Sequence, residues 1–128
     1  MNETIFIMET DPYSAEMLAD TLETFRYEPV IFDEGKDLAV QLSETAPKMV
    51  IINSRIFEKN KQVFVSLKNK EDTLFGASLI LTSGDLVDPQ IIRELEADYF
   101  LYKPYDMKIL SDLLIKVESS RSQPVNSN

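Results

Sequence analysis

The chain of 128 residues contains no cysteine, no histidine and no tryptophan, and only three glycines. Without cysteine and histidine it cannot form a Cys/His zinc site, a Ser-His-Asp triad or a Cys-His dyad. It also cannot pass a phosphoryl group through a histidine of its own. A lack of cysteine is typical of a reducing compartment. These absences exclude a large part of metal and nucleophilic chemistry.

Long apolar segments are also missing. No apolar stretch approaches the roughly 20 residues that are needed to cross a bilayer. The N-terminus has no basic region ahead of an apolar core, so we expect no signal peptide and a cytoplasmic protein that does not contact membranes. With 44% hydrophobic residues the chain is best explained as one globular domain over 1–119, followed by a polar, disordered tail or linker over 120–128.

Positive charge is scarce. Only 13 residues are Lys or Arg against 22 that are Asp or Glu, which gives a formal net charge of −9. Nonspecific binding to nucleic acid depends on Lys and Arg that meet phosphates, so we expect no direct nucleic-acid partner. The acidic balance favours solubility and basic partner surfaces.

What the sequence does contain is a regular alternation of short apolar runs and helical patterns. The runs predict strands over 5–8, 29–32, 49–52, 78–82 and 98–101. Apolar spacing and helix-start signals predict helices that begin at Asp11-Pro12, near Leu38, near Glu58 after a polar loop, at Asp88-Pro89, and ahead of Leu110. Strands that alternate with helices predict a parallel sheet with helices on both faces.

Polar side chains lie at the ends of these predicted strands. Glu9, Asn53, Thr82 and Lys103 each occupy such a position. In open α/β sheets functional groups gather beyond the carboxyl ends of the strands. We therefore expect these four residues to converge in one shallow cleft.

Over residues 4 to 118, the same landmarks resemble the receiver domain of two-component response regulators. The resemblance rests on the segment 8–12 (Met-Glu-Thr-Asp-Pro), Asn53 after an apolar run, Thr82 and Lys103-Pro104. It implies a flavodoxin-like, doubly wound (βα)5 sandwich with strand order 2-1-3-4-5. It also implies a role in phosphorelay signal transduction.

In that family Glu9 would match the first of two acidic magnesium ligands, and Thr10 replaces the second. Asn53 matches the aspartate that accepts the phosphoryl group. Thr82 and Lys103 match the hydroxyl and the ammonium that bind this group, with a cis bond expected before Pro104. Phe100 matches an aromatic switch residue. Phe57 stands where the family usually has a proline, so the loop that contains Phe57 is expected to differ from that of the family.

The departures from the family pattern concern its chemistry. An amide at position 53 is a very poor nucleophile, so phosphorylation there is not expected. Magnesium needs hard, charged oxygen ligands, and one carboxylate is offered where three are usual, so any binding at Glu9 and Asn53 should be weak or absent. We expect no enzymatic activity and no cofactor. Lys103 is instead expected to pair with Glu9 and to donate a hydrogen bond to the Asn53 carbonyl oxygen.

The interpretation that follows is a pseudo-receiver that acts as a protein–protein interaction module. By resemblance, its partners or a second copy would contact the helix after Asp88, the strand over 98–101 and the last helix. Residues that the resemblance points to on this surface are Arg93, Glu94, Tyr99, Phe100, Tyr102 and Tyr105. Exposed tyrosines suit interfaces, although these rings could equally shield the edge of the core.

Two alternatives remain open at this point. An atypical receiver could be switched by phosphorylation elsewhere, for example at Ser54 or Asp11, or by a small ligand at the strand ends. A flavodoxin-like cofactor protein or small enzyme is disfavoured, because the loop over 9–14 is acidic and has no glycine to cradle a phosphate. Taken singly, each landmark also has an ordinary explanation, such as a turn asparagine or a solvated strand-end glutamate.

Overall fold

A computed structural model of the chain describes residues 3–68, 76–84 and 87–122. Its centre is a five-stranded parallel sheet in the order β2-β1-β3-β4-β5. The strands are β1 (Thr4–Met8), β2 (Glu28–Ile31), β3 (Met49–Asn53), β4 (Ser78–Ser83) and β5 (Tyr99–Tyr102). Each bound lies within one residue of the prediction, and the flavodoxin-like, doubly wound arrangement is confirmed.

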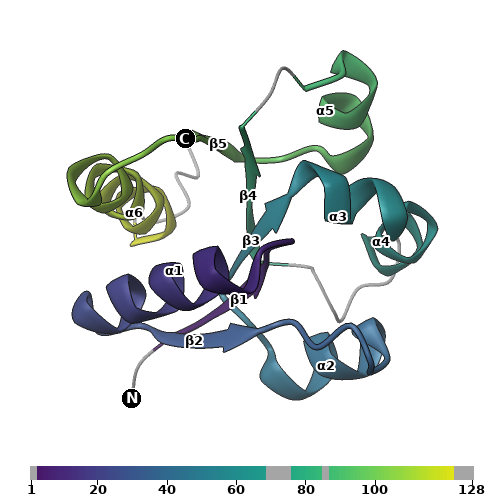
Figure 1. The fold of residues 1–128 in the computed structure, drawn as a ribbon, viewed down its shortest axis with the longest axis horizontal. Helices are drawn as coiled ribbons and strands as arrows, with labels where there is room; N and C mark the ends of the chain where they lie inside the picture. Colours follow the sequence, from purple (N-terminus) through teal and green to yellow (C-terminus); the bar gives the residue numbers. More distant parts are fainter. Residues whose placement is uncertain (1–2, 69–75, 85–86, 123–128) are drawn as a thin grey trace, which may run out of the picture.

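Helices follow the strands and cover both faces of the sheet (Figure 1). They are α1 (Pro12–Thr24), α2 (Leu38–Thr45), α3 (Ser54–Lys59), α4 (Lys61–Lys68), α5 (Pro89–Leu95) and α6 (Met107–Ser122). The predicted start signals of α1 and α5 are confirmed. Asp11 and Asp88 are N-caps whose carboxylates accept backbone N–H bonds, and a proline follows each of them.

The two faces of the sheet bury separate apolar cores. Alternate side chains of β1 and β3, such as Ile7 and Ile51, point to the face that α1 and α6 cover. Their neighbours, such as Met8 and Ile52, pack with side chains of α2, α3 and α5 on the other face. Because the sheet is covered on both faces, β3 is buried along its whole length, which explains its uninterrupted apolar sequence.

The segment after β3 differs from the prediction. The sequence predicted a helix that begins near Glu58 after a polar loop, and this prediction was wrong. Helix α3 begins at Ser54 directly after the strand, and α4 follows a break at Asn60. The Asn53 carbonyl oxygen Oδ1 accepts the Arg55 N–H at 2.8 Å and so caps α3. Phe57 is fully buried and packs against Phe64 with ring centroids 5.8 Å apart. The segment that contains Phe57, which was expected to differ from the family's loop, is thus a helix here.

At the other end of the chain, α6 continues to Ser122, three residues beyond the predicted domain boundary at 119. Residues 123–128 of the predicted tail lie outside the described residues. Within the described part of the chain, no helix has both the length and the apolar character that crossing a membrane requires.

Candidate functional site at the carboxyl ends of the strands

Four strand ends bring the predicted polar residues together. Asn53 and Thr82 are directly paired across β3 and β4. The Lys103 N–H donates to the carbonyl oxygen of Ser83 at 2.9 Å, which fixes the backbone from which the lysine side chain extends. Glu9 follows β1, the other neighbour of β3. The predicted convergence is therefore what the parallel sheet produces.

The strongest contact in the cluster is an ion pair between Glu9 and Lys103. The Lys103 Nζ atom lies 2.8 Å from the Glu9 Oε2 atom. The Glu9 side chain is only 4% exposed, whereas that of Lys103 is 30% exposed. A carboxylate withdrawn so far from water needs a charged partner, and Lys103 supplies it.

The second oxygen of Glu9 is also occupied. Its Oε1 atom accepts the backbone N–H of Thr10 at 2.9 Å and the side-chain amide of Asn53 at 3.3 Å. The expected pairing of Lys103 with Glu9 is present, but the expected Lys103 bond to the Asn53 carbonyl oxygen was wrong. That oxygen instead accepts the Arg55 N–H as the cap of α3, which turns the amide nitrogen towards Glu9.

Hydroxyl groups line the β4 side of the cluster. The Ser54 hydroxyl donates to Ser83 Oγ at 3.4 Å. Thr82 is 1% exposed, and its hydroxyl has no hydrogen-bond partner among the residues that the structure describes. Asp11 lies outside this network, because its carboxylate accepts hydrogen bonds from the Ser14 hydroxyl and N–H, which lower the pKa of Asp11.

Receiver domains use magnesium at the corresponding place, and the residues here do not fit that ion. Magnesium requires several free oxygen ligands in octahedral geometry. Both oxygens of Glu9 and the carbonyl oxygen of Asn53 already accept hydrogen bonds or an ion pair. Nor do three or more acidic residues gather as a metal-binding group anywhere in residues 3–68, 76–84 and 87–122.

The residues predicted for the interface divide between the two faces of the sheet. Phe100 and Tyr102 are 36% and 58% exposed, and their rings stack with centroids 6.1 Å apart and an interplanar angle of 10°. Exposed Arg93 donates to Gln90 Oε1 at 2.9 Å, and Glu94 pairs with Lys61 at 2.8 Å.

Tyr99 and Tyr105, in contrast, are partly buried against the core between the sheet and helices α1 and α6. Burial, and secondarily the charge of Glu9, raise the pKa of the Tyr105 hydroxyl. The structure thus does not place all predicted interface residues on one surface. The reason is the alternation of β5, which sends Tyr99 and Leu101 to one face and Phe100 to the other.

Several solved structures with the same fold are described as response-regulator proteins. A response regulator receiver domain from Methylobacillus flagellatus, described as CheY-like, has a TM-score of 0.72 and 21% identity, over 91% of this chain and 99% of that one. A response regulator from Thermotoga maritima has a TM-score of 0.73 and 14% identity, over 93% and 99%. A response regulator receiver modulated diguanylate cyclase from Pelobacter carbinolicus has a TM-score of 0.71 and 21% identity, over 93% and 94%.

No family model matches the sequence, and no curated protein matches it either. The similarity of this chain to response-regulator proteins therefore rests on its three-dimensional structure. The chain has the fold of response-regulator receiver domains, and its polar cluster occupies the strand ends that this fold brings together.

Proposed function

We propose that this domain is a signalling module of the receiver type that is not phosphorylated at Asn53 and acts through contacts with other proteins. On this proposal it has no enzymatic activity, holds no magnesium and works in the cytoplasm. One observation carries the proposal. The only carboxylate of the strand-end cluster, Glu9, is neutralised by Lys103 and bonded to the amide of Asn53.

The charge arrangement supports a fixed conformation. Phosphoryl transfer needs an ionised acceptor and positioned positive charge. At position 53 there is no acceptor, and the ammonium of Lys103 is already paired at 2.8 Å. The contacts that a phosphoryl group would make are thus replaced by contacts inside the protein. A partner would meet one surface whose shape does not depend on a phosphorylation cycle.

The surface that fits such a partner best is the exposed end of β5 beside α5. Phe100 and Tyr102 present stacked rings there, and Arg93 is exposed on α5. Aromatic and arginine side chains are enriched in the centres of protein interfaces. This smaller set replaces the larger one predicted from the sequence, and it also suits self-association of two copies.

An amide NMR titration with magnesium and beryllofluoride, a mimic of the phosphoryl group, tests whether the strand-end cluster binds a phosphoryl group. We expect no saturable shifts near Asn53 in the wild type and clear shifts in Asn53→Asp. The matched control is Asn53→Ser, which can still cap α3 but adds no carboxylate, and it should stay silent. A saturable response of the wild type centred on Thr82 and Lys103 would overturn the proposal.

One observation favours a second candidate function, a receiver-like domain that is switched by a small ligand at the strand ends. The buried Thr82 hydroxyl lacks a partner among the described residues, and an unpaired buried polar group is costly. A ligand that accepts from this hydroxyl would remove the cost. The same titration separates the two candidates, since only this one predicts a wild-type response.

A further inference from the structure

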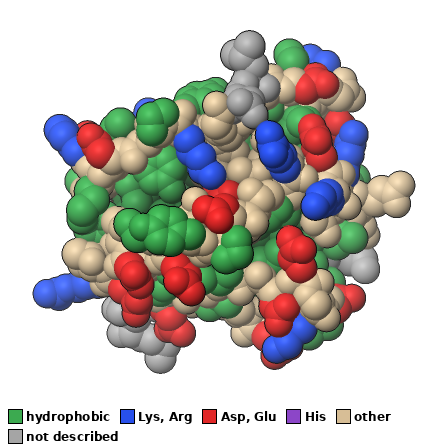
Figure 2. Space-filling view, viewed as in Figure 1, with side chains coloured by type: hydrophobic (Ala, Val, Ile, Leu, Met, Phe, Trp, Pro, Cys, Tyr) green, Lys and Arg blue, Asp and Glu red, His purple; other side chains and the backbone are tan. Residues whose placement is uncertain are grey.

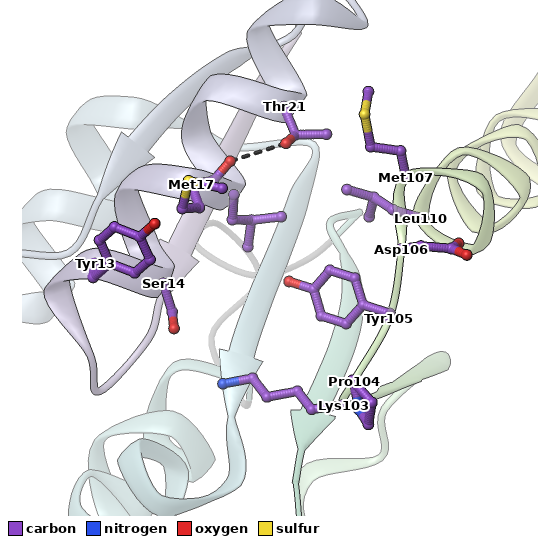
Figure 3. A pocket seen from close by; sticks show the side chains of 11 residues that line it. Tyr13, Ser14, Met17, Thr21, Lys103, Pro104, Tyr105, Asp106, Met107 and Leu110 are labelled. Carbon is purple, nitrogen blue, oxygen red and sulfur yellow. Dashed lines mark hydrogen bonds between the residues drawn. The ribbon is translucent and has the colours of Figure 1, made fainter.

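A groove separates α1 from the segment that leads from β5 into α6 (Figure 3). Its volume is about 470 Å³, within the range of about 300–1,000 Å³ that is usual for sites of small molecules. The α1 side is formed by Tyr13, Ser14, Met17, Leu18 and Thr21, and the other side by residues 103–107 together with Leu110. The groove lies on the side of the sheet away from the Phe100–Tyr102 pair.

The lining of this groove is mainly apolar. Leu18 and Leu110 are buried and belong to the core between the sheet and helices α1 and α6. Met17 and Met107, from opposite walls, are 52% and 54% exposed. Figure 2 shows hydrophobic side chains gathered on the side of the molecule where α1 and α6 lie. Methionines adapt their shape to a bound molecule, which suits the rim of a binding site.

Most polar groups along the groove already have partners. The Ser14 hydroxyl donates to Asp11, and the Thr21 hydroxyl donates to the Met17 carbonyl oxygen at 2.9 Å. The Asp106 carboxylate accepts the N–H of Ile109 at 2.8 Å. Lys103 is paired with Glu9. None of these groups requires a ligand.

The hydroxyl of Tyr105 is different. Its ring extends into the groove towards α1 (Figure 3). Among residues 3–68, 76–84 and 87–122, this hydroxyl has no hydrogen-bond partner, although the residue is partly buried. Burial and the nearby Glu9 charge raise its pKa, so it remains a neutral O–H donor at physiological pH. Tyr13 at the rim also carries a hydroxyl, but that residue is 69% exposed and open to water. An apolar groove with a partly buried free donor is a site with a defined polarity.

We propose that this groove binds a small, uncharged and mainly apolar molecule whose carbonyl-type oxygen accepts a hydrogen bond from Tyr105. Lys103 at the groove is already paired with Glu9, so a carboxylate in the ligand would have to compete with that pair, and the Asp106 carboxylate, which could attract an ammonium, points away from Tyr105 (Figure 3). Either charge would also lose its hydration against an apolar lining. A neutral acceptor avoids these costs. This site shares Lys103 with the strand-end cluster, but it does not depend on the function proposed above.

The test uses three probes of similar size that differ in charge: 4-phenylbutan-2-one, 3-phenylpropanoate and 3-phenylpropylammonium. Each is titrated into the wild-type protein, and amide shifts are followed. We expect the neutral ketone to give saturable shifts in the segments 13–21 and 103–110, with a dissociation constant in the millimolar range that is usual for so small a molecule. The two charged probes should bind more weakly.

Two tyrosine variants test the role of the hydroxyl. Tyr105→Phe retains the ring that packs on the core but removes the donor, so the ketone should bind about three- to tenfold more weakly. Tyr102→Phe removes an exposed hydroxyl on the other side of the sheet and should leave the affinity unchanged. The proposal is overturned if the ketone gives no saturable shifts, if the charged probes bind equally well, or if Tyr105→Phe binds like the wild type. Asn53→Asp should not alter ketone binding, so this test fails or succeeds independently of the phosphorylation test.

Discussion

The side-chain amide nitrogen of Asn53 lies 3.3 Å from the Oε1 atom of Glu9, and the other amide atom caps helix α3. The amide therefore makes two hydrogen bonds: it donates to the Glu9 carboxylate and accepts from the Arg55 backbone N–H. An aspartate could accept from the backbone, but it could not donate to Glu9. The asparagine thus suits a cluster that holds one carboxylate and one ammonium.

Asn53→Asp should destabilise the protein in the absence of a metal ion. Two carboxylates would then face each other across a separation near that of the present hydrogen bond, and Lys103 could neutralise only one of them. We expect the free energy of unfolding to fall by about 1–2 kcal/mol, the equivalent of roughly one pKa unit. The measurement is urea denaturation at neutral pH.

Magnesium should reverse this loss in Asn53→Asp, because a metal ion held between two carboxylates stabilises the state that binds it. The wild type and Asn53→Ser should show no change in midpoint on addition of magnesium chloride. Equal stabilisation of all three proteins would mean that magnesium acts elsewhere and that the two carboxylates of Asn53→Asp do not hold it.

Glu9→Gln should test how much the ion pair contributes. The substitution removes the charge that faces Lys103, but the ammonium is 30% exposed and can regain part of its hydration. We therefore expect a loss of about 1–2 kcal/mol, less than the roughly 3–5 kcal/mol that breaking a fully buried pair costs. The matched control is Asp112→Asn, which breaks the exposed pair with Lys108 and should leave the urea midpoint unchanged. If both variants changed the urea midpoint equally, the Glu9–Lys103 pair would contribute no more to stability than an exposed ion pair.

Much of the fold could be predicted from sequence because its signals are local. A strand buried on both faces needs a continuous apolar run, so β3 could be located almost to the residue. The caps Asp11 and Asp88 are also local signals, since a short acceptor side chain and a following proline are what a helix start needs. The cis bond between Lys103 and Pro104, expected from the family resemblance, is present as well.

Other features depend on contacts between distant segments, which no local pattern reveals. The groove joins Met17 of α1 to Met107 of α6, and nothing in either helix indicates that they face each other. Tyr105 follows β5 in the sequence, which suggests the surface of that strand, but the chain turns after Pro104 and directs the ring towards α1. The early start of α3 is missed when Asn53 is interpreted only as a strand-end residue, although asparagine is also a strong N-cap.

Phe57→Ala tests the finding that residue 57 belongs to a helix and to the core. The ring is fully buried and packs edge-on against Phe64. Its removal should leave a cavity and lower the free energy of unfolding by about 3–5 kcal/mol. Phe100→Ala removes the same ring from an exposed position and should cost far less. Urea denaturation of both variants decides the matter, and equal losses would contradict the burial of Phe57.

Glu9→Gln should also change the ionisation of Tyr105. Burial, and then the charge of Glu9, raise the pKa of Tyr105 above its usual value of 10.0. Removing the charge leaves the burial in place, so the pKa should fall part of the way back. The measurement is the ¹³Cζ shift of the tyrosine followed from about pH 9 upward, with Tyr105→Phe to assign the signal. Asp112→Asn, which removes a carboxylate that does not act on Tyr105, should leave the midpoint unchanged.

The sign of the effect on stability follows from the same shift. Because the folded state holds the Tyr105 proton more tightly than the unfolded state, the contribution of this group is fully present below a pH of about 10. It is lost as the pH rises from there through the higher folded pKa, since the unfolded chain ionises first. Glu9→Gln should therefore make stability decline less steeply with pH in this alkaline range than it does in the wild type. A decline of equal slope, with an unshifted midpoint for Tyr105, would show that Glu9 exerts no charge effect on Tyr105.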